Sequence, residues 1–483
     1  MEEKNNQLSI YSLDHLKPEV VAVAFAKCSR SPDSFAKIAA ELTDEKSADF
    51  HEKWVVGYGH SSVAEHATLH MAVENISILG TKILEDNRLA SYTEKSTRYQ
   101  VFDRDRYYKP ANIIESKHGE KYERIMNEIY DTYNSLFTPM QEFINKKYPK
   151  QPEENDRAYA ATNKARACDN IRYLLPTATL TNLGMTANAR AFEHAVVKLS
   201  SNPLQEIQTI GKILKEEALK ITPTLIKFAN ENAYLKSAAE KMKMAAEKNL
   251  ETTPQSVNAV EIVDYDHEAE NKLITALLYK HSVLPYKQIF ESVKKMTAEE
   301  KEKIIDNALA DRATYDQPIR EFEHIYYTFD ILMDYGAFRD IQRHRMCTQT
   351  NQAVTIIHGY DTPEEIVEAG MEEKYKEVMD KAANLYSTLY PDFPNEAQYV
   401  VPLGFRKRVL YTWNLRELHH FIPLRSGTKG HISYRRIAQA CWQKLNEVQP
   451  LLAKYIRVNM EEGSSSWAST MFNPDYNYMP KKN

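Results

Sequence analysis

The feature that most constrains this fold is an imperfect internal repeat, because four short motifs occur twice in the same order. A Glu-His pair followed by a strand-like apolar run stands at 65–73 and again at 323–331. An arginine-containing segment follows each run, at 85–88 and at 342–345. A duplicated module is the simplest origin of such an arrangement.

The two remaining motifs also keep their internal spacing. Asn188 lies twelve residues after Pro176, and Asn414 lies twelve residues after Pro402. Each Asn opens an Asn-x-Arg sequence that is followed by apolar and histidine residues. Short helix and strand patterns can look alike by chance, but chance does not explain a shared order with shared spacing. We therefore expect two related modules in tandem.

A polar segment with a proline at 251–256 marks the expected join between the modules. It predicts a first module at 1–250 and a second module at 258–483. The first contains extra residues in a polar, Lys- and Tyr-rich stretch at 107–163. Apolar residues recur there at helical intervals from Ile125 to Phe143, which indicates an inserted or lengthened helix.

Both halves combine one strand-like run with long amphipathic segments. Apolar residues are spaced as on helices within 203–228 and within 434–456. Helices should therefore dominate, with a small sheet in each half. The expected fold class is α+β, with each sheet flanked by long helices.

Composition excludes several classes of protein. The 483 residues include 62 Lys and Arg against 67 Asp and Glu, so a strongly basic nucleic-acid binder is not expected. No apolar run approaches the length of a membrane span, and the polar start lacks the pattern of a signal peptide. Four widely separated cysteines argue against disulfide and thiolate-zinc scaffolds, and a reducing cytoplasm fits them best.

A metal site is not expected either. His66 and His70 stand four residues apart, but the HExxH order of zinc helices is absent. Structural histidines are more common than ligands in such a run.

Three polar clusters are candidates for binding chemistry. The first contains Arg339, Arg343, His344 and Arg345, whose guanidinium groups suit phosphate or carboxylate. A solvated basic stretch is the simpler alternative, although apolar neighbours and few nearby acids favour an anion site.

The second cluster, at 91–99, packs hydroxyls, Glu94 and Arg98 into one short segment that can hold a nucleotide, or that is merely a capped polar loop. The third follows Asn414, where Arg416, His420 and Arg425 can line a polar groove beside a helix.

Taken in order, these motifs resemble those of the flavin-dependent thymidylate synthases. The matching blocks are Gly59-His60-Ser61-Ser62-Val63-Ala64-Glu65-His66, the segments 88–99 and 338–345, and the later Asn-x-Arg motifs. Members of that family usually hold one module per chain and assemble as tetramers with active sites between subunits. The resemblance implies that this chain is a tandem fusion of two diverged modules.

The two halves depart from the family pattern in complementary ways. The first half retains His60, Glu65, Ser91, Glu94, Ser96, Arg98 and Arg172. It has Asp86-Asn87 in place of Arg-His, and Leu199 or Ser200 in place of the late Arg. The second half retains Glu323, Arg343, His344, Arg345, Asn414, Arg416 and Arg425. It has Pro318, Asn351, Ala353, Thr355 and Gln398 where the family has His, Glu, Ser, Arg and Arg. One complete composite site can therefore form from unlike halves.

The resemblance implies an FAD-dependent methyltransferase that converts dUMP to its C5-methylated product, with methylenetetrahydrofolate and NADPH as co-substrates. The implied catalytic residues are Arg343 and Arg425. The implied dUMP-binding residues are Ser91, Glu94, Ser96, Arg98, Arg172 and Arg339. The implied FAD-binding residues are Ser29, His60, Ser62, Glu65, His344, Arg345, Asn414, Arg416 and His420.

Two chains are expected to form a homodimer that provides the four modules of a pseudo-tetramer. Two alternatives remain open at this point. One is a flavoenzyme that uses another pyrimidine nucleotide or hydroxymethylates dUMP. The other is a non-catalytic nucleotide-binding derivative of the family.

Overall fold

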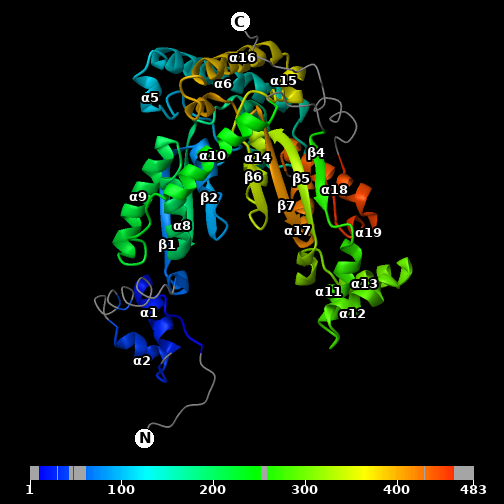
Figure 1. The fold of residues 1–483 in the computed structure, drawn as a ribbon. Helices are drawn as coiled ribbons and strands as arrows, with labels where there is room; N and C mark the ends of the chain where they lie inside the picture. The colour runs from blue at the N-terminus through cyan, green and yellow to red at the C-terminus, as the bar shows by residue number, and fades with distance from the viewer. Residues whose placement is uncertain are drawn as a thin grey trace. The chain divides into compact units, whose positions relative to one another are not determined.

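The computed structural model describes residues 10–29, 31–42, 47, 50, 61–251, 258–428 and 430–461. The chain divides into two compact units, which we call unit 1 and unit 2 (Figure 1). Unit 1 combines residues 1–95 with 180–252, and unit 2 combines 96–179 with 253–483. Each unit contains its own antiparallel sheet.

Unit 1 is built on a three-stranded sheet in the order β1-β3-β2. The strands are β1 (Thr68–Ser77), β2 (Ala90–Glu94) and β3 (Leu180–Asn188). Its helices are α1 (Pro18–Cys28), α2 (Phe35–Ala40), η2 (Ser61–His66), α4 (Ile78–Leu84), α8 (Ala189–Ser200), α9 (Gln205–Ile221) and α10 (Ala233–Asn249). Side chains alternate between buried and accessible along β3, as expected for a sheet covered on one face.

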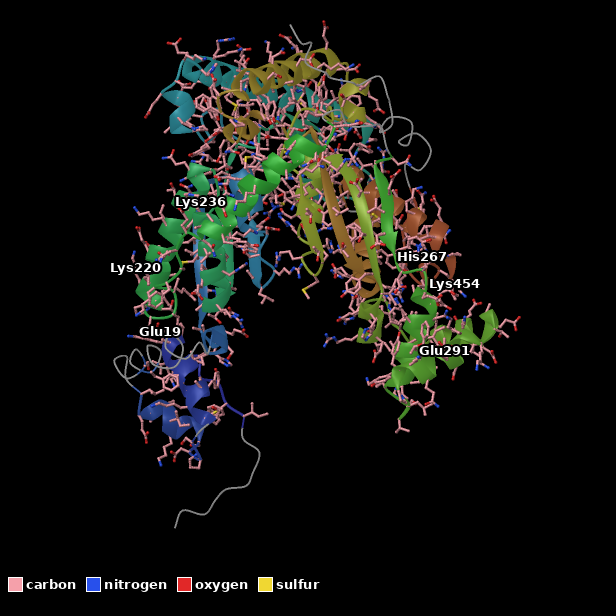
Figure 2. The ribbon with its side chains drawn as sticks, in the orientation of Figure 1. Glu19, Lys220, Lys236, His267, Glu291 and Lys454 are labelled. Atoms are coloured by element: carbon pink, nitrogen blue, oxygen red, sulfur yellow. The ribbon has the colours of Figure 1, made fainter. Side chains whose placement is uncertain are left out.

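Capping side chains fix where the helices of unit 1 begin. Ser77 accepts a hydrogen bond from the Gly80 amide at the start of α4, and Asn188 accepts one from the Ala191 amide at the start of α8. Glu19, labelled on α1 in Figure 2, accepts hydrogen bonds from the amide and the hydroxyl of Thr224, at 3.0 and 2.7 Å. These bonds attach the N-terminal helix to the segment after α9.

Unit 2 contains a four-stranded sheet in the order β4-β5-β7-β6. The strands are β4 (Val260–Tyr265), β5 (Tyr326–Asp334), β6 (Thr348–Asn351) and β7 (Arg406–Asn414). The helices contributed by 96–179 are α5 (Ala111–Ile114), α6 (Gly119–Lys147), α7 (Asp156–Ile171) and η3 (Arg172–Leu174). The helices up to β5 are α11 (Ala269–Tyr279), α12 (Tyr286–Lys294), α13 (Ala298–Leu309) and η4 (Arg320–His324). The later ones are α14 (Tyr335–Ile341), α15 (Glu364–Glu368), α16 (Glu372–Leu389), η5 (Glu396–Val400), α17 (Leu415–Ser426), α18 (Ile432–Val448) and α19 (Pro450–Ala453).

Strand register confirms the tandem α+β fold. Thr68 pairs with Asn188 in unit 1, as Tyr326 pairs with Asn414 in unit 2. Helices α4 and α14 both have seven residues, and α8 and α17 both have twelve. The sequences of the two copies can therefore be aligned position by position along these two pairs of helices.

The helices predicted from periodicity are present with different ends. The predicted helix at 125–143 lies within α6, whose fully buried tyrosines include Tyr130 and Tyr133. The predicted helix at 434–456 is interrupted, because α18 ends before Gln449 adopts an extended φ of −145° and Pro450 opens α19. Among the described residues, no helix is both long and apolar enough to cross a membrane.

The compact units do not follow the two sequence halves. The repeated Leu-Pro and Val-Pro segments pair with each other through an antiparallel bridge between Pro176 and Pro402. The Thr177 amide donates to the Val401 carbonyl, and reciprocally the Leu403 amide donates to the Leu175 carbonyl, both at 2.9 Å. This backbone pairing holds residues 96–179 in unit 2, so residues of both sequence halves meet in one unit. The division into modules 1–250 and 258–483 stays a prediction about the repeat itself.

Candidate functional site

Arginine side chains from both sequence halves gather around Asp340 in unit 2. Helix α14 begins where the buried Asp334 accepts a hydrogen bond from the Ala337 amide, and its last turn contains Arg339 and Asp340. Burial would raise the pKa of Asp340, but surrounding guanidinium charges hold it below its ordinary value. The arginines responsible are Arg172, Arg425, Arg343 and Arg339.

Arg98 approaches the same place from the first half. Its Nε lies 2.8 Å from Asp169 Oδ1, and its Nη2 lies 2.7 Å from Asp169 Oδ2. This is the bidentate geometry that fixes a guanidinium plane. We call Arg98, Arg172, Arg339, Arg343 and Arg425 the arginine cluster. The carboxylates that lie beside these guanidinium groups in the described residues include Asp169 and Asp340.

Arg172 is the most unusual member of the arginine cluster. Only 3% of it is exposed, and its Nε lies 3.8 Å from Asp169 Oδ1, beyond hydrogen-bond distance. Among the described residues, neither its Nε nor its Nη2 has a hydrogen-bond partner. Buried donors are nearly always satisfied, because an unmade bond costs about 1–3 kcal/mol. A buried guanidinium with two unsatisfied nitrogens is suited to an anionic ligand.

Arg339 connects α14 to the loop contributed by the first half. Its Nη1 donates to Thr97 Oγ1 at 3.0 Å, and both side chains are buried. In that loop, Ser96 Oγ accepts a hydrogen bond from the Arg98 amide at 3.2 Å. The structure thus brings together Ser96, Arg98, Arg172 and Arg339, four of the residues predicted to bind dUMP.

His344 lies inside the protein between two side chains of α17, those of Glu417 and Arg425. Its Nδ1 is 3.1 Å from Glu417 Oε1, and its Nε2 accepts from Arg425 Nε at 2.9 Å. Burial, reinforced by the charges of Arg425 and His420, lowers the pKa of His344 well below its ordinary value. The imidazole is therefore neutral.

The Asn-x-Arg motif positions α17. Asn414 Oδ1 accepts a hydrogen bond from the Glu417 amide as the N-cap. Arg416 donates from Nε to the Pro318 carbonyl at 2.7 Å and from Nη1 to Glu323 at 2.9 Å. His420 is exposed one turn later on the same helix.

The comparisons with known proteins decide the family. Residues 13–224 and 261–451 match the family model described as thymidylate synthase complementing protein. The chain belongs to the flavin-dependent thymidylate synthase family. The two matched regions are one copy each of the tandem repeat.

The similar proteins fall into two groups according to how much of this chain they match. A UPF0159 protein of Chlamydia pneumoniae is 32% identical over 434 residues, covering 86% of this chain and 82% of the relative. A UPF0159 protein of Thermoplasma acidophilum is 29% identical over 453 residues, covering 86% and 90%. A flavin-dependent thymidylate synthase of Sulfurisphaera tokodaii is 30% identical over 237 residues, covering 48% of this chain and 79% of the relative. Similarity to the first two proteins therefore spans both modules, whereas similarity to the third spans one module's length.

Several predicted residues of this thymidylate synthase family chain belong to unit 1 and not to the arginine cluster. Ser29 Oγ donates to the Ala26 carbonyl at the end of α1, and Ser62 is exposed in η2. Glu65 is paired with Arg190, the counterpart of the pair between Glu323 and Arg416. His60 lies outside the described residues. The roles of these residues toward FAD stay predictions.

Ser91 and Glu94 lie on β2 but differ in environment. Ser91 is exposed on a sheet-face groove of about 450 Å³, which His70 and Thr186 also line. Glu94 is buried, accepting from Lys82 Nζ at 2.9 Å and from Thr81 Oγ1 at 3.1 Å. The Glu94 carboxylate is therefore an internal ion-pair partner of unit 1.

Unit 1 has no equivalent of the arginine cluster at the matching positions. Lys82 takes the place of Arg339, and it is paired with Glu85 and Glu94. Asp86 takes the place of Arg343 and is paired with Lys198. At these two positions unit 1 therefore has side chains that form ion pairs within the unit, where unit 2 has arginines.

Sequence reasoning missed four residues that organise the site. Asp169, Asp340 and Glu417 are the acids that orient its arginines and its histidine, and Thr97 receives Arg339. Asp169 stands three residues before Arg172, a helical spacing that could have suggested a pairing. Thr97 lies within the polar segment 91–99 that the sequence singled out, but nothing in that segment marks it as the partner of Arg339.

Proposed function

We propose that the chain is a thymidylate synthase that transfers a one-carbon unit from methylenetetrahydrofolate to C5 of dUMP, with FAD as cofactor and NADPH as reductant. The buried guanidinium of Arg172, with two unsatisfied nitrogens inside the arginine cluster, is the observation that supports this proposal most strongly. A nucleotide monophosphate supplies the missing acceptors, because phosphate oxygens match the fork of a guanidinium.

The residues of unit 2 divide between the two ends of the nucleotide in this proposal. Arg98 and Arg172 would hold the phosphate, since Asp169 orients the first and leaves donors on the second. Arg343 and Arg425 would face the uracil carbonyls and stabilise the negative charge that develops on the ring. Asp340 stays ionised among these arginines and keeps their guanidinium groups in place.

The side chains near α17 fit one part of FAD. Arg345 and His420 provide hydrogen-bond donors, and the Arg345 guanidinium also provides a positive charge, which suits a diphosphate. Asn414, His344 and Arg416 already bond within the protein, so we assign them to the support of α17 and Arg425. When bound, the reduced flavin supplies the redox chemistry that amino-acid side chains lack. Two chains would provide the four modules of the expected pseudo-tetramer.

The first prediction is that the purified protein binds FAD and converts dUMP to dTMP. An absorbance scan should show flavin bands, and a reaction with methylenetetrahydrofolate and NADPH should yield dTMP by mass spectrometry. A hydroxymethylated product would show instead that the enzyme hydroxymethylates dUMP. Absence of flavin bands after incubation with FAD would contradict both enzyme proposals.

A further inference from the structure

Glu417, His344 and Arg425 form a line of hydrogen-bonded side chains that ends at Arg425. Glu417 and Arg425 lie two turns apart on α17, and His344 follows α14. Glu417 Oε1 is 3.1 Å from His344 Nδ1, and Arg425 Nε is 2.9 Å from His344 Nε2. The His344 side chain is 4% exposed and the Glu417 side chain 14%, so little water competes for these bonds.

Donor chemistry fixes the direction of the line. A guanidinium can only donate, so His344 Nε2 must present a lone pair to Arg425. A neutral imidazole has one ring proton, which must then be on Nδ1 and point to Glu417. Burial also raises the pKa of Glu417 to about 7, yet a carboxyl oxygen accepts this hydrogen bond in either protonation state.

Arg425 is thereby held on more than one side. Its Nε is directed at His344, its Nη1 lies 3.8 Å from Asp340 Oδ1, and its guanidinium lies 5.3 Å from the centre of the Tyr434 ring. Of these contacts, only the bond to His344 depends on a tautomer. Building on the proposed function, we propose that Glu417 is a positioning residue that, through His344, holds the Arg425 guanidinium in the orientation needed to contact the nucleotide.

The internal repeat separates this role from the needs of the fold. Unit 1 keeps the architecture of the motif, because Asn188 caps α8 and Arg190 pairs with Glu65. At the positions of Glu417, His344 and Arg425 it has Ala191, Asn87 and Leu199. All three residues are replaced together in the copy that lacks the arginine cluster. The line is therefore dispensable for the module's fold and is associated with the site.

Nuclear magnetic resonance of the full chain, labelled with ¹⁵N in histidine and arginine, tests this proposal without any assay of activity. The His344 signals are assigned by their loss in His344→Gln. The ring should be in the Nδ1–H tautomer, and the Arg425 Nε–H should exchange slowly with solvent. An Nε2–H tautomer in the parent protein would overturn the proposal even if no variant folds.

Two substitutions of Glu417 then separate the effect of its hydrogen-bond acceptor from the effect of its charge. Glu417→Leu should increase Arg425 Nε–H exchange at least tenfold, and should lower kcat/KM for dUMP by a similar factor. Glu417→Gln retains an acceptor oxygen, so both effects should stay below threefold. Glu193→Leu removes a half-buried glutamate from the equivalent helix of unit 1 and should leave the His344 and Arg425 signals unchanged.

The outcomes distinguish this inference from the proposed function. Slow Arg425 Nε–H exchange that persists in Glu417→Leu would overturn the positioning role. A protein that shows the predicted tautomer and exchange but forms no product from dUMP would contradict the proposed reaction alone.

Discussion

Replacing Arg172 with alanine should lower the affinity for dUMP by about a hundredfold. A hydrogen bond to a charged group contributes about 1.5–3 kcal/mol, and about 1.4 kcal/mol corresponds to a factor of ten in affinity. Arg172 has two unsatisfied nitrogens in a buried place, so one well-made pair of bonds accounts for the expected loss. Isothermal titration calorimetry with dUMP measures it directly.

Helix α7 also contains a matched control. Arg166 donates to Asn163 at 3.1 Å and lies over the Tyr148 ring, so it has partners of its own and is not part of the arginine cluster. Arg166→Ala should bind dUMP with nearly the parent affinity. The affinity of Arg172→Lys for dUMP should lie between those of the parent and of Arg172→Ala, because lysine keeps the charge but lacks the planar guanidinium. Parent-like affinity in Arg172→Ala would remove the main support for the nucleotide site.

Arg343→Ala should lower kcat by about a hundredfold to a thousandfold while changing dUMP affinity less. A donor aimed at developing charge acts mainly on the transition state, and loss of one such donor typically has this magnitude. Arg343 is exposed beside the ionised Asp340, where it can reach a bound base. Steady-state kinetics of dTMP formation separate kcat from KM.

The same variant allows a test of the unit 1 copy. Adding Asp86→Arg and Asn87→His to Arg343→Ala restores the missing pair in unit 1. We expect no recovery of activity, because Lys82 remains paired there with Glu85 and Glu94, and Leu199 occupies the position of Arg425. Recovery would mean that unit 1 supports a second active site.

The repeat, one strand of each sheet and the long α6 helix could be predicted because each depends on local patterns. Apolar spacing identified α6, and the Glu-His motifs located β1 and β5. The membership of 96–179 in unit 2 could not be predicted in this way. It depends on backbone pairing between Pro176 and Pro402, which are far apart in sequence and have no shared periodicity.

The candidate site was predictable in its residue types but not in all its contacts. Resemblance to the family selected Arg98, Arg172 and Arg339, which the structure places in one unit. It also suggested His344 as a flavin ligand, whereas both ring nitrogens bond to α17 residues. Whether a polar side chain faces a ligand or a neighbouring helix depends on packing, which motif spacing does not encode.

We infer that the chain forms one nucleotide site, built in unit 2 from residues of both sequence halves. Calorimetric titration of the FAD-loaded protein with dUMP measures the number of sites per chain. We predict saturation at one dUMP per chain, and loss of that site in both Arg98→Ala and Arg425→Ala. Saturation at two equivalent dUMP molecules per chain would contradict a single composite site.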